Sequence, residues 1–339
     1  MGTVGASDER RVSGSIYRRV VVVGGAGFIG SHVVRTLLQR DGVEGVVVYD
    51  NFSSGRRWHL DTYAADVRLQ IVEGEIHDLE RLVAAVAGAT TIVHLASNPD
   101  IARAMTDPTI DFEQGTALTH CVVEAARRQS VQLVLYASGS GVYGDLAELE
   151  AREDHGPLEP VSTYGASKLA GEALLASYCH MFGLRGRACR FGNVVGPNQT
   201  HGVGFDFVRK LLTDPTRLEI LGDGRQSKSY VHVDDVIAAL LLVGEQRQPP
   251  YAVYNVATGD YITVAEIAAL AIECVGLEPA AVHLAYRGGD RGWQGDVPVV
   301  RIATERIRAL GWQPRRGSRE ALRQSILSML DDARVGRLW

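Results

Sequence analysis

Long apolar stretches, abundant cysteine and an excess of basic residues are all missing from this 339-residue sequence. No hydrophobic run reaches the roughly 20 residues that a membrane-spanning helix requires, so we expect no membrane insertion. The 40 acidic and 35 basic residues give a net charge of −5. This balance does not favour binding to nucleic acid or to an anionic membrane surface.

Cysteine and histidine are too scattered for a metal centre or a redox pair. The four cysteines form no C-x-x-C pair, and none belongs to a Cys/His cluster with ligand spacing. We therefore expect no metal. Each cysteine lies in an apolar context, which predicts buried, reduced thiols in a cytoplasmic protein: Cys121, Cys179, Cys189 and Cys274.

The first 17 residues are polar and contain glycine and serine. They lack the apolar core of a secretory signal peptide, so the sequence does not indicate secretion. We expect residues 1–17 to form a disordered extension.

From residue 18 onward the chain alternates β-branched runs with amphipathic segments. Residues 19–24 (RVVVVG) and 45–50 (GVVVYD) have the continuous apolar character of buried parallel strands. This alternation predicts an α/β fold built on a Rossmann-type doubly wound parallel sheet. Further strands are expected at 67–72, 91–96, 131–138 and 187–195, and helices at 28–39, 78–86, 107–128 and 162–182.

Three glycines follow the first expected strand in the segment GGAGFIG (24–30). Gly24 allows the tight turn, Gly27 lets the backbone approach a pyrophosphate, and Gly30 lets helix and strand pack closely. The helix that begins here directs free N–H groups toward phosphate. Asp50 ends the second expected strand, 20 residues after Gly30, where a carboxylate can accept hydrogen bonds from ribose hydroxyls. Together these features predict a dinucleotide site.

The acid at position 50 also discriminates between the two nicotinamide cofactors. A carboxylate repels the 2′-phosphate of NADP, so the sequence favours NAD, although Arg56 and Arg57 nearby could bind a phosphate. Glu75 and Ile76 follow the third expected strand. An acidic side chain there could accept a hydrogen bond from the adenine amino group, and a solvated surface carboxylate is the alternative.

Tyr164 and Lys168 are four residues apart in the segment YGASK, so they share one face of the expected helix 162–182. A free tyrosine has a pKa of roughly 10, and a nearby ammonium lowers it by favouring the phenolate. The phenolate could take a proton from a sugar hydroxyl while hydride leaves the same carbon for nicotinamide. A Tyr and a Lys four residues apart occur often by chance on helices. The position of this pair after the fifth strand of a Rossmann unit is what favours a catalytic role.

The pattern loosens after residue 196. Short strands at 218–221 and 252–256 mix with helices expected at 233–243, 263–275, 303–310 and 318–330. We expect residues 18–196 to form most of the NAD-binding Rossmann domain, with segments around 230–260 returning to it. Residues 197–339 would form most of a smaller, mixed α/β substrate-binding lobe.

The chain resembles the extended short-chain dehydrogenases/reductases, in particular the NAD-dependent epimerases and dehydratases of nucleotide sugars, from residue 19 to 314. The motifs that carry the resemblance are GGAGFIG, DNFSSG (from 50), HLAS (94–97), SGSGVYG (138–144), YGASK, RFGNVVGP (190–197), LGDGRQSKSYVHVDDV (221–236), YNVATG (254–259) and GGDRGWQGDVP (288–298). It implies an NAD site made by Gly24, Gly27, Phe28, Ile29, Gly30, Asp50, Asn51, Ser53, Ser54, Gly55, Glu75, Ile76, Leu95, Ala96 and Ser97, together with Tyr164 and Lys168.

The resemblance also implies residues that would bind a nucleotide sugar. Asn193 would contact the region of the diphosphate, and Lys228 and Arg291 would face its phosphates. Val203 and Leu221 would border the nucleotide base. Lys228 stands where relatives often carry Arg, and a lysine neutralises phosphate without a bidentate fork.

One catalytic position departs from the family pattern. Gly139 stands where the family usually has a Ser or Thr whose hydroxyl bridges tyrosine and substrate. Ser138 and Ser140 are the neighbouring hydroxyls and are both catalytic candidates. We expect Ser140 to reach the substrate, because Ser138 should lie deeper in the strand.

The same turn indicates which reaction to expect. Ser140-Gly141 stands where the 4,6-dehydratases of this family carry Asp-Glu, whose Glu helps to move a proton at carbon 5. Without that acid we expect oxidation and re-reduction at carbon 4, hence NAD-dependent 4-epimerisation. The stretch NPDIARAMTDP (98–108) resembles the UDP-glucose and UDP-glucuronate 4-epimerases, which favours a UDP-sugar. A dehydratase, a 4-keto-reductase and a non-catalytic NAD-binding redox sensor are the alternatives.

The expected helices at 107–128 and 162–182 are long and apolar on more than one face. Such helices suit a helical interface between two copies of the chain. We therefore expect a homodimer.

Overall fold

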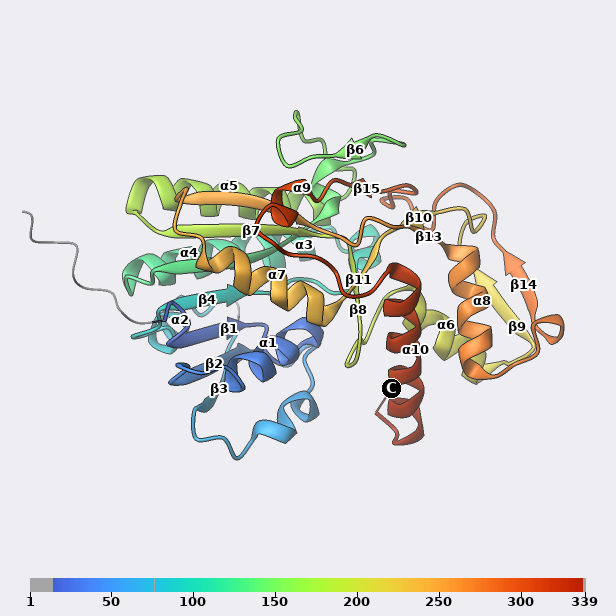
Figure 1. Cartoon of the computed structure of the whole chain (residues 1–339), viewed down its shortest axis with the longest axis horizontal. Helices are drawn as coiled ribbons and strands as arrows, with labels where there is room; N and C mark the ends of the chain where they lie inside the picture. Colours follow the sequence, from blue (N-terminus) through green and yellow to red (C-terminus); the bar gives the residue numbers. More distant parts are fainter. Residues whose placement is uncertain (1–14, 76, 338–339) are drawn as a thin grey trace, which may run out of the picture.

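The computed structural model describes residues 15–75 and 77–337. Its centre is a parallel sheet of seven strands in the order β12-β7-β5-β4-β1-β2-β3 (Figure 1). With β1 between β2 and β4, this is the order of a doubly wound Rossmann sheet, as the sequence predicts. The strands are β1 Arg19–Val23, β2 Gly45–Asp50, β3 Leu69–Glu73, β4 Thr91–His94, β5 Leu133–Gly139, β7 Arg185–Phe191 and β12 Tyr251–Val256.

Helices cover both faces of this sheet because the central strand is apolar on both. Successive side chains of a strand point to opposite faces, and Val20 and Val22 pack on one side with α1 (Phe28–Leu38) and α7 (Val233–Glu245). Val21 and Val23 pack on the other side with the second layer of helices. That layer consists of α2 Leu79–Ala85, α4 Leu118–Arg128 and α5 Thr163–Phe182.

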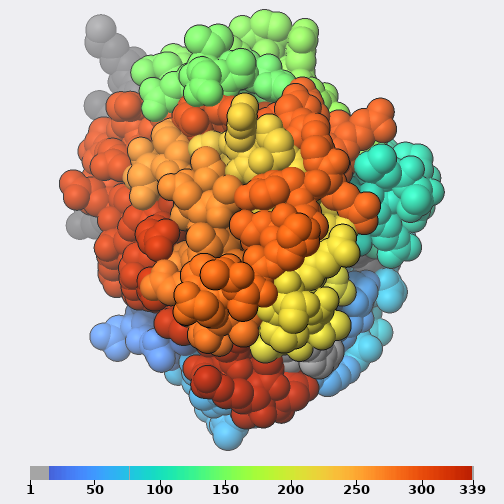
Figure 2. Space-filling model, turned by 90° about the vertical axis from the view of Figure 1, so that its right-hand side faces the viewer, coloured from blue at the N-terminus to red at the C-terminus, as the bar shows by residue number. Residues whose placement is uncertain are grey.

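A smaller lobe with its own core lies beyond the carboxyl ends of the strands (Figure 1). Three helices pack around a short parallel pair of strands, and Figure 2 shows the face that this lobe presents. These elements are α6 Val203–Thr213, α8 Val264–Val275, α10 Ser318–Arg334, β9 Arg217–Ile220 and β14 His283–Tyr286.

The chain passes between the two lobes more than once. After β7, Gly192 N–H donates to Val256 O at 2.9 Å, and β8 (Asn193–Val195) then pairs with β11 (Tyr230–His232). The chain next returns to the large sheet through α7 and β12. Two further short pairs, β10 Ser227–Lys228 with β13 Ile262–Thr263 and β15 Arg301–Ile302 with β6 Glu150–Ala151, extend the smaller lobe and its border.

Several expected elements differ from the observed ones. The strand expected at 187–195 divides at Gly192, because the chain leaves the large sheet there. The helix expected at 107–128 begins as α3 (Thr109–Asp111), widens into a π-helical segment (η3, Phe112–Ala117) and continues as α4. α6 is absent from the sequence-based expectations.

The expected extension at 1–17 also needs a correction at its end. Residues 1–14 lie outside the described residues. Tyr17, in contrast, is fully buried, and its hydroxyl donates to Leu241 O of α7 at 2.7 Å. The packed chain therefore begins before residue 18, because an aromatic side chain anchors it under α7.

Candidate active site

The glycine-rich turn between β1 and α1 has the backbone proximity that the sequence predicts. Gly24 adopts φ +83°, and a Cβ there would lie 2.7 Å from the backbone nitrogen of Ala96. A Cβ on Gly30 would lie 2.1 Å from Gly24 O. Both obstacles are backbone atoms that cannot rotate away. The turn therefore requires glycine at both positions, and it leaves the start of α1 open to a phosphate group.

Asp50 closes this turn from the end of β2. Its Oδ2 accepts the N–H of Ala26 at 2.9 Å, and its Oδ1 accepts the N–H of Phe52 at 2.8 Å. Burial raises the pKa of the carboxyl, and these two hydrogen bonds oppose the shift. A Cβ on Gly55 would lie 2.8 Å from Oδ1. Only a residue without a Cβ therefore fits at position 55, against the side chain of Asp50, which is 8% exposed.

Side chains beyond Asp50 form an exposed border. Asn51 Nδ2 donates to Glu75 Oε2 at 3.2 Å, and Ser53 N–H donates to Asn51 Oδ1 at 3.1 Å. Arg57, which could have bound a 2′-phosphate, is instead paired with Glu73 and lies over the ring of Phe52. The pairing supports the preference for NAD. Ile76 lies outside the described residues.

Tyr164 and Lys168 lie on the first turns of α5, facing the end of β5. The Ser162 hydroxyl caps this helix by accepting the N–H of Gly165 at 3.1 Å. Lys168 is buried, and its Nζ donates to Ala137 O at 2.9 Å while lying 5.4 Å from the centroid of the Tyr164 ring. The pair is thus brought together at the carboxyl edge of the sheet.

The pKa of the phenol corrects one expectation. Burial raises the pKa of Tyr164 to about 12, a hydrogen bond with the Ser97 hydroxyl opposes this, and the Asp111 carboxylate adds to it. Burial also lowers the pKa of Lys168 to about 8. The expected lowering by the ammonium is therefore wrong for these residues taken alone, because desolvation of the phenol dominates.

A buried carboxylate connects the loop after β4 to the start of α5. Asp111 is only 1% exposed. Its Oδ1 accepts Asn98 Nδ2 at 2.9 Å, and its Oδ2 accepts the Thr163 hydroxyl at 2.7 Å. Asn98 follows Ser97, and Thr163 precedes Tyr164. No local motif in the sequence indicates this clamp, since its three members come from separate segments.

The structure corrects the catalytic assignment of Ser138. Its hydroxyl donates to Glu172 Oε1 at 2.5 Å, inside a buried ion pair between Glu172 and Arg190 at 2.7 Å. Ser138 therefore serves the packing of β5 against α5 instead of facing a substrate. Ser140 is half-buried and begins a 3-10 turn (η4, Ser140–Tyr143) after the strand.

The predicted cationic residues of the substrate side do come together. Lys228 Nζ lies 2.5 Å from Asp296 Oδ1, and Arg291 donates to Asp296 O at 2.8 Å and to Asp145 Oδ2 at 2.7 Å. A Cβ on Gly295 would lie 3.2 Å from the Ser162 Cβ, at the cap of α5. The loop at 288–298 therefore links the two cations to the catalytic helix. Asp296 is not among the site residues predicted from the sequence.

The other predicted substrate residues border the same region. Asn193 of β8 lies opposite Tyr230 of β11, two residues from Lys228. Leu221 is 47% exposed. A Cβ added to Gly292, the residue after Arg291, would lie 3.9 Å from the Leu221 Cβ. Val203 begins α6.

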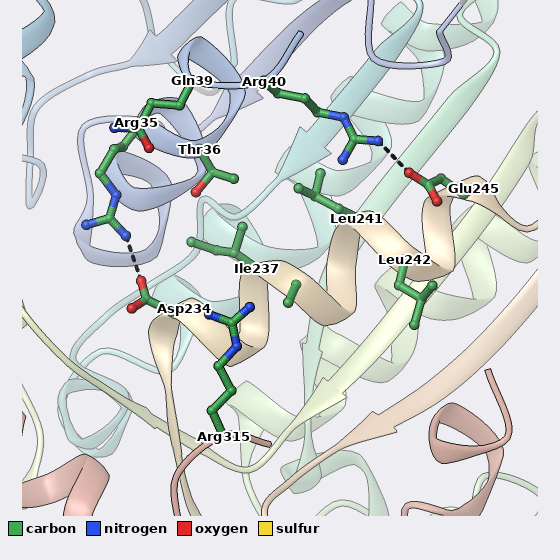
Figure 3. A pocket seen from close by; sticks show the side chains of 11 residues that line it. Arg35, Thr36, Gln39, Arg40, Asp234, Ile237, Leu241, Leu242, Glu245 and Arg315 are labelled. Atoms are coloured by element: carbon green, nitrogen blue, oxygen red, sulfur yellow. Dashed lines mark hydrogen bonds and ion pairs between the residues drawn. The ribbon is translucent and has the colours of Figure 1, made fainter. Parts of the chain in front are cut away.

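A pocket of about 640 Å³ lies away from this region, between α1 and α7 (Figure 3). Arg35 pairs with Asp234 at 2.6 Å, and Arg40 pairs with Glu245 at 2.5 Å, on either side of apolar side chains such as Ile237. Four of its five charged residues form these two ion pairs, and neither the glycine turn nor Tyr164 lines it. We therefore place the chemistry at the carboxyl edge of the sheet.

Within residues 15–75 and 77–337, no group of three or more His, Cys, Asp or Glu side chains is placed to hold a metal ion. In the same part of the chain, no helix combines the length and apolar character needed to cross a membrane.

Comparison with known proteins places these features in a family. A model of the NAD dependent epimerase/dehydratase family matches residues 20–257. The UDP-glucose 4-epimerase of Mycolicibacterium smegmatis is 33% identical over 91% of this chain and 97% of its own length. A dTDP-glucose 4,6-dehydratase of Streptomyces antibioticus is 30% identical over 94% and 93%.

Solved structures agree with this placement. A crystal structure of a UDP-galactose 4-epimerase superposes with a TM-score of 0.81 at 35% identity, covering 93% of this chain and 99% of that one. MoeE5 in complex with UDP-glucuronic acid and NAD superposes with a TM-score of 0.81 at 31% identity, with the same coverage. The glycine turn, and the Asp50 carboxylate that closes it from the end of β2, fit the dinucleotide. The chain belongs to the NAD-dependent epimerase/dehydratase family of nucleotide-sugar enzymes, and its cofactor is NAD.

Proposed function

We propose that the chain is a UDP-sugar 4-epimerase that converts UDP-glucuronate or UDP-glucose to the galacto form through a transient 4-keto sugar. The observation that carries the proposal is the turn after β5. Ser140 and Gly141 occupy it, so it brings no carboxylate to Tyr164. A Cβ on Gly165 would lie 2.4 Å from Gly141 O, so this turn is pressed against the first turn of α5.

The acid that influences Tyr164 is not available to a substrate. Asp111 is 1% exposed, and both of its carboxylate oxygens accept hydrogen bonds from other side chains. Proton transfer at carbon 5, which a dehydratase needs, would require an acid or base within hydrogen-bond reach of that carbon's substituents. The site therefore favours chemistry confined to carbon 4.

Tyr164 is the base in this proposal. With a pKa of about 12, only on the order of one phenol in 10⁵ is ionised at pH 7. Bound NAD supplies the hydride acceptor, and the positive charge of its oxidised ring favours the phenolate. Tyr164 takes the proton of the carbon-4 hydroxyl as hydride leaves that carbon, and returns it after the keto sugar has turned over.

The cations on the substrate side support a diphosphate substrate. Lys228 and Arg291 converge on Asp296, next to the smaller lobe, which we assign to the nucleotide sugar. A diphosphate would compete with Asp296 for both cations. The UDP-sugars named for the M. smegmatis and MoeE5 relatives support UDP-glucose and UDP-glucuronate as candidates.

The test is to incubate the purified protein, without added cofactor, with each of the two UDP-sugars and to follow the coupling at carbon 4 by proton NMR. Conversion to the galacto sugar supports the proposal. A 4-keto-6-deoxy product would identify a dehydratase, and stoichiometric consumption of added NADH would identify a reductase. The Tyr164→Phe variant should still bind NAD and lose turnover. Unchanged behaviour of that variant would favour a redox sensor.

We infer a homodimer from the outer face of the helices that carry the site. Met105 ends a 3-10 turn (η2, Ile101–Met105), Phe112 begins η3 and Met181 lies near the end of α5, and their side chains are 55%, 61% and 71% exposed. Contiguous exposed apolar side chains are typical of an interface, and these three lie on helical segments of the layer that carries the site. Light scattering at micromolar concentration should give twice the chain mass, and a monomer mass would contradict the inference.

A further inference from the structure

We propose that Tyr136 is a positioning residue for the reaction, and that the face of its ring holds the ammonium of Lys168 charged and in place beside Tyr164. The inference rests on the catalytic pair of the function proposed above, and it extends that pair to a neighbour on β5. Tyr136 lies in the middle of this strand and is not among the site residues predicted from the sequence.

The contact between Tyr136 and the lysine is direct and buried. Lys168 Nζ lies over the Tyr136 ring, 5.3 Å from its centroid, and 5.4 Å from the centroid of the Tyr164 ring. Lys168 and Tyr136 are only 3% and 1% exposed. A cation within about 6 Å of a ring centroid is attracted by the ring quadrupole, most strongly where both groups are desolvated. Tyr136 therefore offsets part of the cost of burying the ammonium.

The packing of β5 against α5 fixes the position of this ring. The Tyr136 hydroxyl oxygen lies 3.5 Å from Lys168 O. A Cβ on Gly171, three residues after Lys168, would lie 2.3 Å from the same hydroxyl oxygen and 2.6 Å from the Tyr136 Cζ. The ring thus fits against α5 because position 171 carries no side chain, and it meets the helix within one turn of Lys168.

A neutral histidine lies beside the same ring. The centroids of His94 and Tyr136 are 5.3 Å apart. The Thr119 hydroxyl donates its proton to Gly115 O at 2.7 Å, so its oxygen accepts the Nε2–H of His94 at 3.0 Å. Burial lowers the pKa of His94 to about 3, and the charge of Lys168 adds to this shift. His94 is therefore uncharged near neutral pH and does not compete with the ammonium for the ring.

The remaining neighbours of the ammonium are a carbonyl and a more distant carboxylate. Lys168 Nζ donates to Ala137 O at 2.9 Å. The Asp111 charge raises the pKa of Lys168, but burial dominates and lowers it to about 8. Both oxygens of Asp111 accept hydrogen bonds from other side chains, those of Asn98 and Thr163. Neutral groups therefore make the direct contacts that we name for the ammonium, and the Tyr136 ring is one of them.

Loss of the ring should have an effect that grows with pH. The ammonium favours the phenolate of Tyr164, so the reaction needs Lys168 in its charged form. That form is present below the pKa of the lysine. Removing the ring lowers this pKa, so the lysine stays charged at pH 6 and loses its proton too early near pH 8.

The charge of Lys168 can be measured directly, because the chain has only three lysines, Lys168, Lys210 and Lys228. The holoenzyme is labelled with lysine carrying ¹³C at the ε carbon and titrated by NMR, and the signal missing from Lys168→Met is assigned to position 168. Tyr136→Leu removes the ring and Tyr136→Phe keeps it. We expect the Lys168 midpoint to fall by about one pH unit in Y136L and by less than about 0.3 unit in Y136F.

Tyr17 provides a matched control outside the site. It is also a buried tyrosine beside a cation, with Arg40 lying 5.1 Å from its ring centroid. Tyr17→Leu should lower the free energy of unfolding and leave the Lys168 midpoint unchanged. If Y136L does not fold, pentafluorophenylalanine at position 136 takes its place. This residue keeps the shape of the ring and removes its negative face, so it should lower the midpoint relative to Y136F.

The second readout is the first hydride transfer, measured as reduction of the bound cofactor by near-ultraviolet absorbance. UDP-glucose, UDP-glucuronate and dTDP-glucose are the probes, because this step is common to epimerase, dehydratase and reductase. Y136L should match the wild-type rate at pH 6. It should be slower by about fivefold at pH 8 and about tenfold at pH 9, in proportion to the charged fraction of Lys168.

Three results would overturn the role of the ring: an unchanged Lys168 midpoint in Y136L, an equal shift in Y136F, or an equal shift in Y17L. The first would remove the contact, the second would assign it to the hydroxyl, and the third would make it a general loss of packing. If the midpoint responds as expected but no galacto sugar forms, the epimerase proposal fails while the ring contact stands. A galacto product with an unchanged midpoint has the opposite meaning.

Discussion

Replacing Glu172 by Gln should destabilise the protein more than any other single loss of charge that we name. Glu172 and Arg190 are 5% and 3% exposed, and the guanidinium donates twice to the carboxylate, at 2.9 and 2.7 Å. Ser138 adds a third donor. An amide at position 172 presents an N–H₂ group to these donors and leaves Arg190 charged, buried and unpaired. Breaking a buried pair in this way costs about 3–5 kcal/mol.

The assay is equilibrium unfolding in urea, comparing E172Q with Glu124→Gln. Glu124 makes the matched control, since it also accepts hydrogen bonds from guanidinium groups, three at 2.8 Å, but its partners Arg127 and Arg128 are 40% and 38% exposed. We expect a loss below about 1 kcal/mol for this surface variant. Equal losses in the two variants, or a loss under about 1 kcal/mol for E172Q, would refute the argument from burial.

Three further outcomes follow from the site. Gly30→Ala should abolish NAD retention, measured by the absorbance of the purified protein, because its Cβ would lie 2.1 Å from Gly24 O; retained cofactor would contradict this. Lys168→Met should remove a pH dependence of the free energy of unfolding. Burial lowers the pKa of Lys168 to about 8, so the unfolded chain binds more protons than the folded one between pH 8 and 10. The stability of the wild-type protein should therefore rise with pH in that range. Urea midpoints at both pH values, compared between the two proteins, check the sign. Lys228→Ala should raise the KM for the UDP-sugar by about tenfold with a smaller change in kcat, because it removes a contact to the diphosphate; an unchanged KM would place Lys228 in the Asp296 pair alone.

The NAD side of the site could be predicted from the sequence because it depends on local backbone geometry. Gly24 follows β1, Gly30 lies in the first turn of α1 and Asp50 ends β2, so their roles follow from the turn after β1 and the strand beside it. The Tyr164–Lys168 pair could be predicted from its helical spacing and its position after β5.

The role of Ser138 could not be predicted in the same way. The function of a serine depends on its hydrogen-bond partner, and that partner can lie far away in the sequence. For Ser138 that partner is Glu172, 34 residues away. Asp111 illustrates the same limit, because its hydrogen bonds join three separate segments. α6 was missed because it begins with Val203-Gly204, in a stretch whose glycines indicate a loop.

The edge strand β12 of the large sheet comes late in the sequence, and this limits how the protein can be truncated. Six residues of β12, Tyr251–Val256, pair with β7, more than 50 positions after the chain has left that sheet. A fragment that stops near residue 196 would expose the hydrogen-bonding groups of β7 as a bare edge, which invites aggregation. It would also lack α7, which covers one face of β1 and β5. No single truncation therefore gives an independently folding Rossmann domain. The two lobes should be expressed together and should unfold as one unit.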